Sequence, residues 1–326
     1  MRLRLLPLLA SPLLLVGCNP EPNPGPRIDL VGSTTPAFLS ADRSSTTPAD
    51  TFTTRVFAQA RDTLSGPALT RLRITVDYSP YRNPYIYPTT TAFDPKLVPK
   101  ETTSFVYLDS VLAPGKRAVA FQYTAVTRST SGRETWTFQV EDTEGASNKR
   151  SYRLTLRNTD SLLTYHRYTL RLQAPRTRNS RSYLALSAGL ALPAFALGAS
   201  TAQNRDSIDV VYLPLGVGAR GLAAPADPTV PLAAWSPGSK RATEFRRTAV
   251  GFTFNNFTEA DTTPELLAAF NAGTAFAPST RTGTLTKGQV VAFRTAGEKP
   301  KVGLLYIEDF PTAPQAAILL QVRITK

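Results

Sequence analysis

Alternation between apolar and polar residues is the feature that most restricts the fold of this sequence. In the run TWTFQVE, at positions 135–141, Trp136, Phe138 and Val140 fall on one face of an extended strand and polar residues fall on the other. Similar runs, rich in β-branched and aromatic residues, recur along the chain and are separated by Gly, Pro, Asn and Asp, whereas helical periodicity is scarce. The sequence therefore predicts a mostly β fold.

The first half of the chain contains the clearest series of such runs. They lie at 27–31, 53–60, 72–78, 104–108, 117–127, 135–141 and 152–157. Short strands at this spacing, over about 130 residues, predict a β-sandwich. The segment TWTFQVEDTEGASNKRSYRLTLRN resembles the last hairpin of immunoglobulin-like and PKD-like modules of bacterial surface proteins, with an aromatic strand, a D-x-x-G turn and a closing strand. This resemblance implies an immunoglobulin-like sandwich over 27–160 and carries no information on a ligand.

The second half, 162–326, is predicted to form another antiparallel β-rich domain with one or two short helices. Alternating runs lie at 165–173, 182–187 and 207–213, and three more runs close the chain. The segment PELLAAFN, at 264–271, is the best helix, because Thr262 or Thr263 can cap it and Gly273 can end it. The apolar run at 186–200 is interrupted by proline and small polar residues, which favours a buried loop or short helix over a membrane segment.

The order of motifs in this half also carries a resemblance. SYLALSAG, SIDVVYL, LAAPADP, the loop WSPGSKRATEF, LTKGQVVAFRT and VGLLYIEDF follow one another as in the C-terminal half of lipoproteins from Bacteroidota whose role is unknown. The resemblance spans about half of the chain and implies no particular chemistry.

The N-terminus has the features of an export signal. Two arginines precede an apolar run at 5–16, which is too short to cross a bilayer, since that takes about 20 residues. The sequence LVGC that ends at Cys18 resembles the lipobox of bacterial lipoproteins. That resemblance implies that 1–17 is a cleaved signal peptide, that Cys18 carries diacylglycerol, and that the protein is an outer-membrane lipoprotein of the cell envelope, facing either the periplasm or the outside. The alternative is an ordinary signal peptide with an incidental cysteine.

The residues 18–26 then form a Pro-rich tether, because proline fixes φ and removes backbone donors. Since Cys18 is the only cysteine, the chain forms no internal disulfide.

The formal charge of +13 is concentrated in the second half, where 165–326 hold 18 basic and 10 acidic residues. Arg176, Arg178 and Arg181 form a cluster that could contact a polyanion such as an anionic glycan. The alternative is a solvated basic face. Nucleic acid is not an expected partner, because an exported lipoprotein rarely meets it.

Catalytic motifs are scarce. His166 is the only histidine and lies in a strand-like run, which favours an exposed or edge-strand residue over a catalytic base. Zinc sites built from His and Cys are excluded by count. The acidic turn at 141–144 lacks the D-x-D-x-D pattern of a Ca²⁺ loop. We therefore expect no cofactor, no metal site and no enzymatic activity.

Aromatic residues supply the candidate binding sites. In SPYRNPYIYP, Tyr81, Tyr85 and Tyr87 are interleaved with prolines, which would present flat rings at low entropic cost to a sugar or a protein. Alternatively, these rings cover a sheet edge. Trp235 is a second candidate platform, with core packing as its alternative. The predicted function is non-enzymatic binding of a surface glycan or an outer-membrane protein. A structural spacer is the main alternative, and a hydrolase of unrecognised type is a third.

Overall fold

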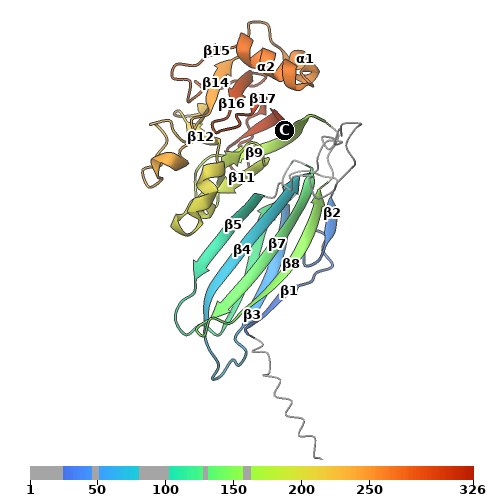
Figure 1. Ribbon diagram of the computed structural model, residues 1–326, viewed down its shortest axis with the longest axis vertical. Helices are drawn as coiled ribbons and strands as arrows, with labels where there is room; N and C mark the ends of the chain where they lie inside the picture. The colour runs from blue at the N-terminus through green and yellow to red at the C-terminus, as the bar shows by residue number, and fades with distance from the viewer. Residues whose placement is uncertain (1–24, 46–50, 81–102, 128–130, 157–162) are drawn as a thin grey trace, which may run out of the picture.

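The computed structural model describes residues 25–45, 51–80, 103–127, 131–156 and 163–326. The chain is mostly β, with several antiparallel sheets and a few short helices, as predicted (Figure 1). Among the described residues, none of the helices is both long and apolar enough to cross a bilayer.

Residues 25–156 form two sheets that enclose a common core. The strands are β1 (Arg27–Val31), β2 (Arg43–Ser45), β3 (Thr51–Gln59), β4 (Leu69–Pro80), β5 (Thr103–Val111), β6 (Ala118–Val126), β7 (Gly132–Asp142) and β8 (Ser147–Leu156). One sheet has the order β1-β3-β6 and the other β2-β8-β7-β4-β5. All seven predicted segments are strands. The additional strand β2 is three residues long and its residues Arg-Ser-Ser are polar, so it has no alternation to detect.

The strand β7 shows why the alternating pattern predicts this half so well. Its side chains are buried at every second position, and Trp136 is fully buried between the sheets. The ring of Trp136 lies 5.4 Å from those of Phe52 and Tyr107, which come from opposite sheets. Aromatic side chains thus fill the space that period-2 alternation creates on the inner faces.

The acidic turn after β7 uses its own carboxylate to fold. Asp142 Oδ1 accepts hydrogen bonds from the backbone N–H groups of Glu144, at 3.0 Å, and Ala146, at 2.9 Å. Gly145 adopts a φ of +78°, which glycine tolerates without steric cost. This Asx-type turn accounts for the D-x-x-G motif through local hydrogen bonding.

The second half forms two further sheets. Their strands are β9 (Tyr165–Gln173), β10 (Arg181–Ala185), β11 (Leu190–Pro193), β12 (Val210–Pro214), β13 (Arg220–Ala223), β14 (Glu244–Arg247), β15 (Thr274–Ala275), β16 (Val290–Arg294), β17 (Val302–Asp309) and β18 (Ala317–Thr325). The orders are β11-β10-β12-β13 and β15-β14-β16-β17-β18-β9. The antiparallel run β16-β17-β18 corresponds to the three segments predicted at the end of the chain. No sheet combines strands from the two halves among the described residues, and the boundary between independently folding domains stays a prediction.

Two α-helices, α1 (Phe254–Glu259) and α2 (Thr263–Ala272), cover one face of the six-stranded sheet. α2 matches the predicted helix. Its capping box is complete, since Thr262 Oγ1 accepts from the Glu265 N–H and Glu265 Oε2 accepts from the Thr262 N–H at 3.0 Å. α1 was not predicted, because six residues rich in Phe, Asn and Thr have low helix propensity and show too little periodicity.

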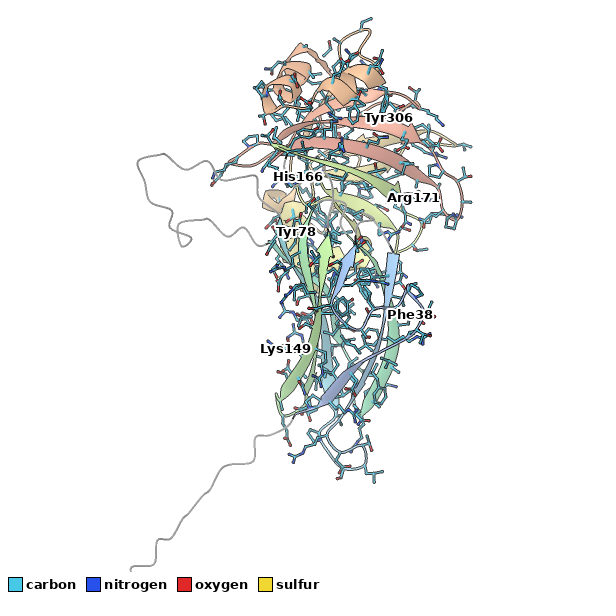
Figure 2. The ribbon with its side chains drawn as sticks, turned by 90° about the vertical axis from the view of Figure 1, so that its right-hand side faces the viewer. Phe38, Tyr78, Lys149, His166, Arg171 and Tyr306 are labelled. Atoms are coloured by element: carbon cyan, nitrogen blue, oxygen red, sulfur yellow. The ribbon has the colours of Figure 1, made fainter. Side chains whose placement is uncertain are left out.

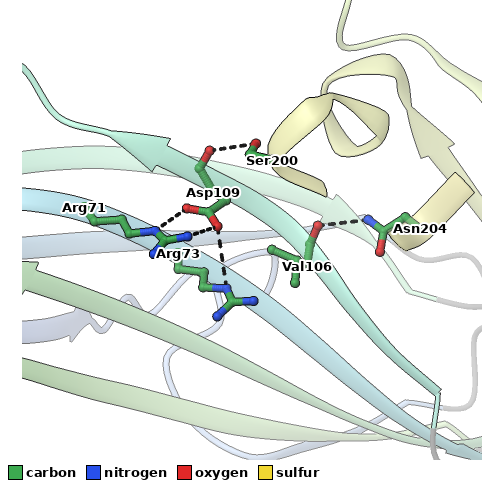
Figure 3. A network of polar contacts seen from close by, with 6 residues as sticks. All are labelled: Arg71, Arg73, Val106, Asp109, Ser200 and Asn204. Atoms are coloured by element: carbon green, nitrogen blue, oxygen red, sulfur yellow. Dashed lines mark hydrogen bonds and ion pairs between the residues drawn. The ribbon is translucent and has the colours of Figure 1, made fainter. Parts of the chain in front are cut away.

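The apolar run at 186–200 folds into β11, the 3₁₀ turn η2 (Ala194–Leu197) and the start of η3 (Ala199–Ser207). The expected short helix is thus present as 3₁₀ turns, and part of the run is a strand. η3 packs on β5 of the sandwich and joins the two halves (Figure 3). Asn204 Nδ2 donates to the carbonyl of Val106 at 2.9 Å, and Ser200 Oγ donates to the carbonyl of Asp109 at 3.3 Å.

An apolar cluster continues through this contact. The core of the sandwich extends without a break to residues of the second half, including Leu190, Leu197 and Trp235. Phe195 of η2 packs against Tyr107 of β5, with ring centroids 5.4 Å apart. The two halves are therefore held together by buried apolar surface as well as by hydrogen bonds.

Candidate functional site

A cavity of about 230 Å³ lies where the sandwich meets the second half. Tyr78 and Phe105 of the sandwich and His166 of β9 line it. Figure 2 shows Tyr78 and His166 where the two halves meet. Its polar wall also includes Ser187, Asp206, Asp209, Arg241 and Lys301. We call this the junction cavity. Its wall brings together a histidine, two aspartates, an arginine and a lysine, so it is the candidate site.

A buried ion pair forms the centre of the polar wall. Asp209 immediately precedes β12 and is 3% exposed. Its Oδ2 accepts from the Leu186 N–H at 2.9 Å, and its Oδ1 lies 2.8 Å from Arg241 Nε. The backbone N–H of Asp209 donates to the carbonyl of Leu184, also at 2.9 Å. The carboxylate is thereby fixed in position by β10 and by the residues that follow it.

Arg241 is held by three separate segments. Besides its contact with Asp209, its Nη1 donates to the carbonyl of Asp206 at 3.1 Å, and its Nη2 donates to the carbonyl of Ala296. The side chain of Arg241 is 27% exposed, so part of the guanidinium faces the cavity. A planar guanidinium with several fixed contacts costs little entropy when it binds a further acceptor.

Burial dominates the electrostatics of this pair. Desolvation raises the pKa of Asp209 to about 6, although the nearby charge of Arg241 and the hydrogen bond from Leu186 act in the opposite direction. The carboxyl group therefore titrates close to neutrality, which is unusual for an aspartate and is common at functional sites.

The structure places His166 on an edge strand, as one part of the expectation of an exposed or edge-strand histidine had it. β9 is the last strand of its sheet, and His166 pairs with Ile324 of β18. His166 is 7% exposed, so it is buried at the junction cavity instead of facing solvent.

The predicted binding residues fall into different environments. Cys18, Tyr81, Tyr85 and Tyr87 lie outside the described residues. Trp235 is 7% exposed, stacks on Tyr183 with ring centroids 6.0 Å apart, and belongs to the apolar core. It therefore packs in the core and is not an exposed platform.

The predicted arginine cluster is divided. Arg176 and Arg178 are exposed on the loop between β9 and β10. Arg181 begins β10 and is partly buried, and this burial lowers the pKa of its guanidinium. The three guanidinium groups therefore do not share one solvated environment, which leaves Arg176 and Arg178 as the exposed pair.

The residues of the junction cavity were not singled out from the sequence. One signal was present, since Asp209 stands between isoleucine and valine in the run SIDVVYL, and a carboxylate in an apolar strand needs a partner. Nothing in the sequence identifies that partner as Arg241, which follows 32 positions later in a loop. Within the described ranges, no three or more His, Cys, Asp or Glu residues gather as a metal site would require.

Comparisons with known proteins add little about function. No family model and no curated protein matches the chain. Among solved structures, it is similar to a DUF4466 family protein from Parabacteroides merdae ATCC 43184, at 12% identity over 93% of this chain and 99% of the other, with a TM-score of 0.36. It is also similar to the sporulation control protein Spo0M from Bacillus subtilis, at 10% identity over 93% and 91% of the two chains, with a TM-score of 0.24. With TM-scores this low, neither likeness assigns a function.

The raised pKa of Asp209 predicts a specific pH dependence of stability. An acid that binds its proton more tightly in the folded state stabilises the fold at low pH, and this contribution is lost as pH rises from about 4 to about 6. At about 1.4 kcal/mol per pKa unit, the loss is roughly 3 kcal/mol. Asp209→Asn cannot titrate at this position. We therefore expect the parent, measured by urea unfolding, to lose more unfolding free energy between pH 4 and pH 7 than the variant does. An equal difference at both pH values would show that Asp209 titrates near its ordinary pKa.

Proposed function

We propose that this protein is an outer-membrane lipoprotein of the cell envelope that binds a polyhydroxylated ligand, such as the terminal sugar of a surface glycan, without catalysing a reaction. The observation that carries the proposal is the fixed Asp209–Arg241 pair in the wall of the junction cavity. The pair places a carboxylate and a guanidinium, each held by other contacts, in the wall of one small cavity.

The chemistry of the cavity wall suits hydroxyl groups. Carboxylates of Asp206 and Asp209 can accept hydrogen bonds, and Arg241 can donate them. Tyr78 and Phe105 add aromatic rings to the wall of the same cavity, and both side chains are almost fully buried. A sugar ring presents both hydroxyl groups and apolar C–H faces, so it matches this mixture better than a purely apolar or purely anionic ligand does.

A binding role is better supported than hydrolysis. Glycoside hydrolysis needs two carboxyl groups that face each other across the scissile bond. Asp206 and Asp209 both line the cavity, but both oxygens of Asp209 already engage partners, one the Leu186 N–H and the other Arg241. A carboxylate held in this way is suited to orienting a ligand.

The proposed anchor gives the molecule an orientation. Eight residues, 19–26, stand between Cys18 and β1, and an extended chain from Cys18 to β1 reaches roughly 30 Å. β1 begins at the end of the sandwich that lies farthest from α1 and α2 (Figure 1). A lipid on Cys18 would therefore place the immunoglobulin-like sandwich next to the membrane and the helices away from it.

A structural spacer is the second candidate function, and one observation favours it. The apolar core continues from the sandwich into the second half, which makes the pair of halves suitable as a stiff stalk. A spacer needs no ligand, so ligand binding at the junction cavity separates the two proposals.

The anchor is tested by Cys18→Ser in cells that process lipoproteins. The variant should remain uncut and should move from the detergent phase to the aqueous phase in Triton X-114 partitioning, because several acyl chains hold a protein on a membrane and an unmodified serine does not. If the variant still partitions into detergent like the parent, the anchor at Cys18 is wrong.

The cavity is tested on a glycan array with the soluble chain. Ser187→Phe fills the junction cavity and should abolish the signal of any glycan that the parent binds, while Ser151→Phe, on the exposed face of β8, should leave it unchanged. Asp206→Asn, at an exposed position, should weaken binding by about tenfold, since a hydrogen bond to a charged group is worth roughly 1.5–3 kcal/mol.

The same array distinguishes the cavity from the tyrosine loop. Replacing Tyr81, Tyr85 and Tyr87 together by alanine should leave glycan binding intact if the cavity holds the ligand. Loss of binding in this triple variant, with Ser187→Phe still active, would move the site to the loop. If the parent protein binds no glycan on the array, the result would favour the structural spacer as its function.

A further inference from the structure

A second concave surface lies on the helical end of the molecule, away from the junction cavity. It is an open groove of about 390 Å³ between α1, α2 and the loop that precedes α1. Small apolar side chains form much of its surface, with Ala249, Ala268 and Ala272 exposed at its sides and Phe252 partly buried. We call it the helical groove.

The groove exists because α2 carries apolar residues on more than its packed face. Leu266 and Phe270 are fully buried with strands of the six-stranded sheet. Leu267 is 44% exposed, and Ala268 and Ala272 are also exposed. These residues give α2 an apolar surface in addition to the face that packs on the sheet.

Two exposed apolar residues are close in sequence to residues that line the groove. Val250, beside the lining residue Ala249, is fully exposed, and Phe254 of α1 is 41% exposed. The ring of Phe254 lies 4.6 Å from that of Tyr306 and is therefore fixed against β17 while it stays accessible. A fixed, accessible aromatic ring is a typical anchor in a protein interface.

The charge of this region is opposite to that of the rest of the chain. No lysine or arginine occurs from 248 to 280, and the three charged residues there are Glu259, Asp261 and Glu265, in a chain of formal charge +13. Glu259 and Glu265 line the groove. The arginines that touch α2 from the neighbouring strands, Arg246 and Arg294, both pair with Glu244, at 2.8 Å and 2.6 Å.

We infer that the helical groove is a docking site for an extended peptide segment of a partner protein, in which an apolar side chain stands next to Lys or Arg. The alanine surface leaves room for one or two apolar side chains, and the acidic rim attracts the adjacent cations. An anionic membrane surface does not fit, because the same carboxylates would repel it. This inference does not depend on the ligand of the junction cavity.

The probe for this site is a fluorescein-labelled peptide with a central Leu-Phe pair flanked by two lysines on each side. Fluorescence anisotropy should show saturable binding to the soluble chain. Two matched peptides, one with glutamates for the lysines and one with Ser-Ser for Leu-Phe, should bind at least about tenfold more weakly, equivalent to about 1.4 kcal/mol.

Variants of exposed residues locate the binding without disturbing the core. Ala268→Tyr fills the groove and should weaken the lysine peptide by about tenfold or more, while Asn271→Tyr, exposed on the same helix outside the groove, should have no effect. Glu259→Lys should weaken binding about threefold at low salt, and the difference should vanish near 0.5 M salt. Glu298→Lys, which makes the same change in net charge elsewhere, is its control.

Several results would overturn the inference. These are the absence of saturation up to about 1 mM peptide, equal binding of the lysine and glutamate peptides, or equal binding by Ala268→Tyr and Asn271→Tyr. Sedimentation that shows self-association of the parent, abolished by Ala268→Tyr, would instead identify a second copy of this chain as the occupant. Binding of the parent to phosphatidylglycerol vesicles, lost in the same variant, would identify a membrane.

Discussion

The contact between η3 and β5 is the interaction on which the rest of the structure depends. It joins the open edge strand of the sandwich to the second half, and the apolar core continues across it. An edge strand leaves backbone groups without a partner in the sheet, and Asn204 occupies one of them by donating to the carbonyl of Val106. Apolar burial stabilises this contact, and the hydrogen bond of Asn204 fixes where η3 lies along β5.

The junction cavity is a consequence of this contact. Side chains of the sandwich and of the second half leave a space of about 230 Å³ between them, and polar groups line part of it. The cost of burying Asp209 is visible in its raised pKa, and the protein offsets it only in part with Arg241 and the Leu186 N–H. A buried ion pair is weak evidence for stability, and the position of this one in the cavity wall is consistent with the binding role proposed above.

Much of the fold could be predicted from the sequence, because the signals that identify it are local. Period-2 alternation located β7 and β9, and the threonine cap together with the terminal glycine located α2. The turn at Asp142 was identifiable because its hydrogen bonds are made within five residues. α1 was missed for the opposite reason, since tertiary contacts of Phe257 with Tyr306 stabilise a segment of low propensity.

The candidate sites could not be predicted in the same way, because they depend on residues that are distant in the chain. Asp209 and Arg241 meet only after β10, β12 and the following loops have packed. Trp235 could be exposed or buried on sequence grounds, and only the packing of Tyr183 decides the question. The acidic region at 248–280 is visible in the sequence, but its groove is formed by residues of α1, α2 and the loop before α1 that meet only in the folded chain.

The central claim is that the two halves form one rigid unit, since both the junction cavity and the stalk require it. The lone cysteine makes a direct measurement simple: in a Cys18→Ser background, cysteines at Ser151 on β8 and Asn271 on α2 can carry spin labels for double electron–electron resonance. We predict a single narrow distance distribution, which broadens when Phe195 and Asn204 are both replaced by alanine. A broad or bimodal distribution in the background with both residues intact would contradict the account.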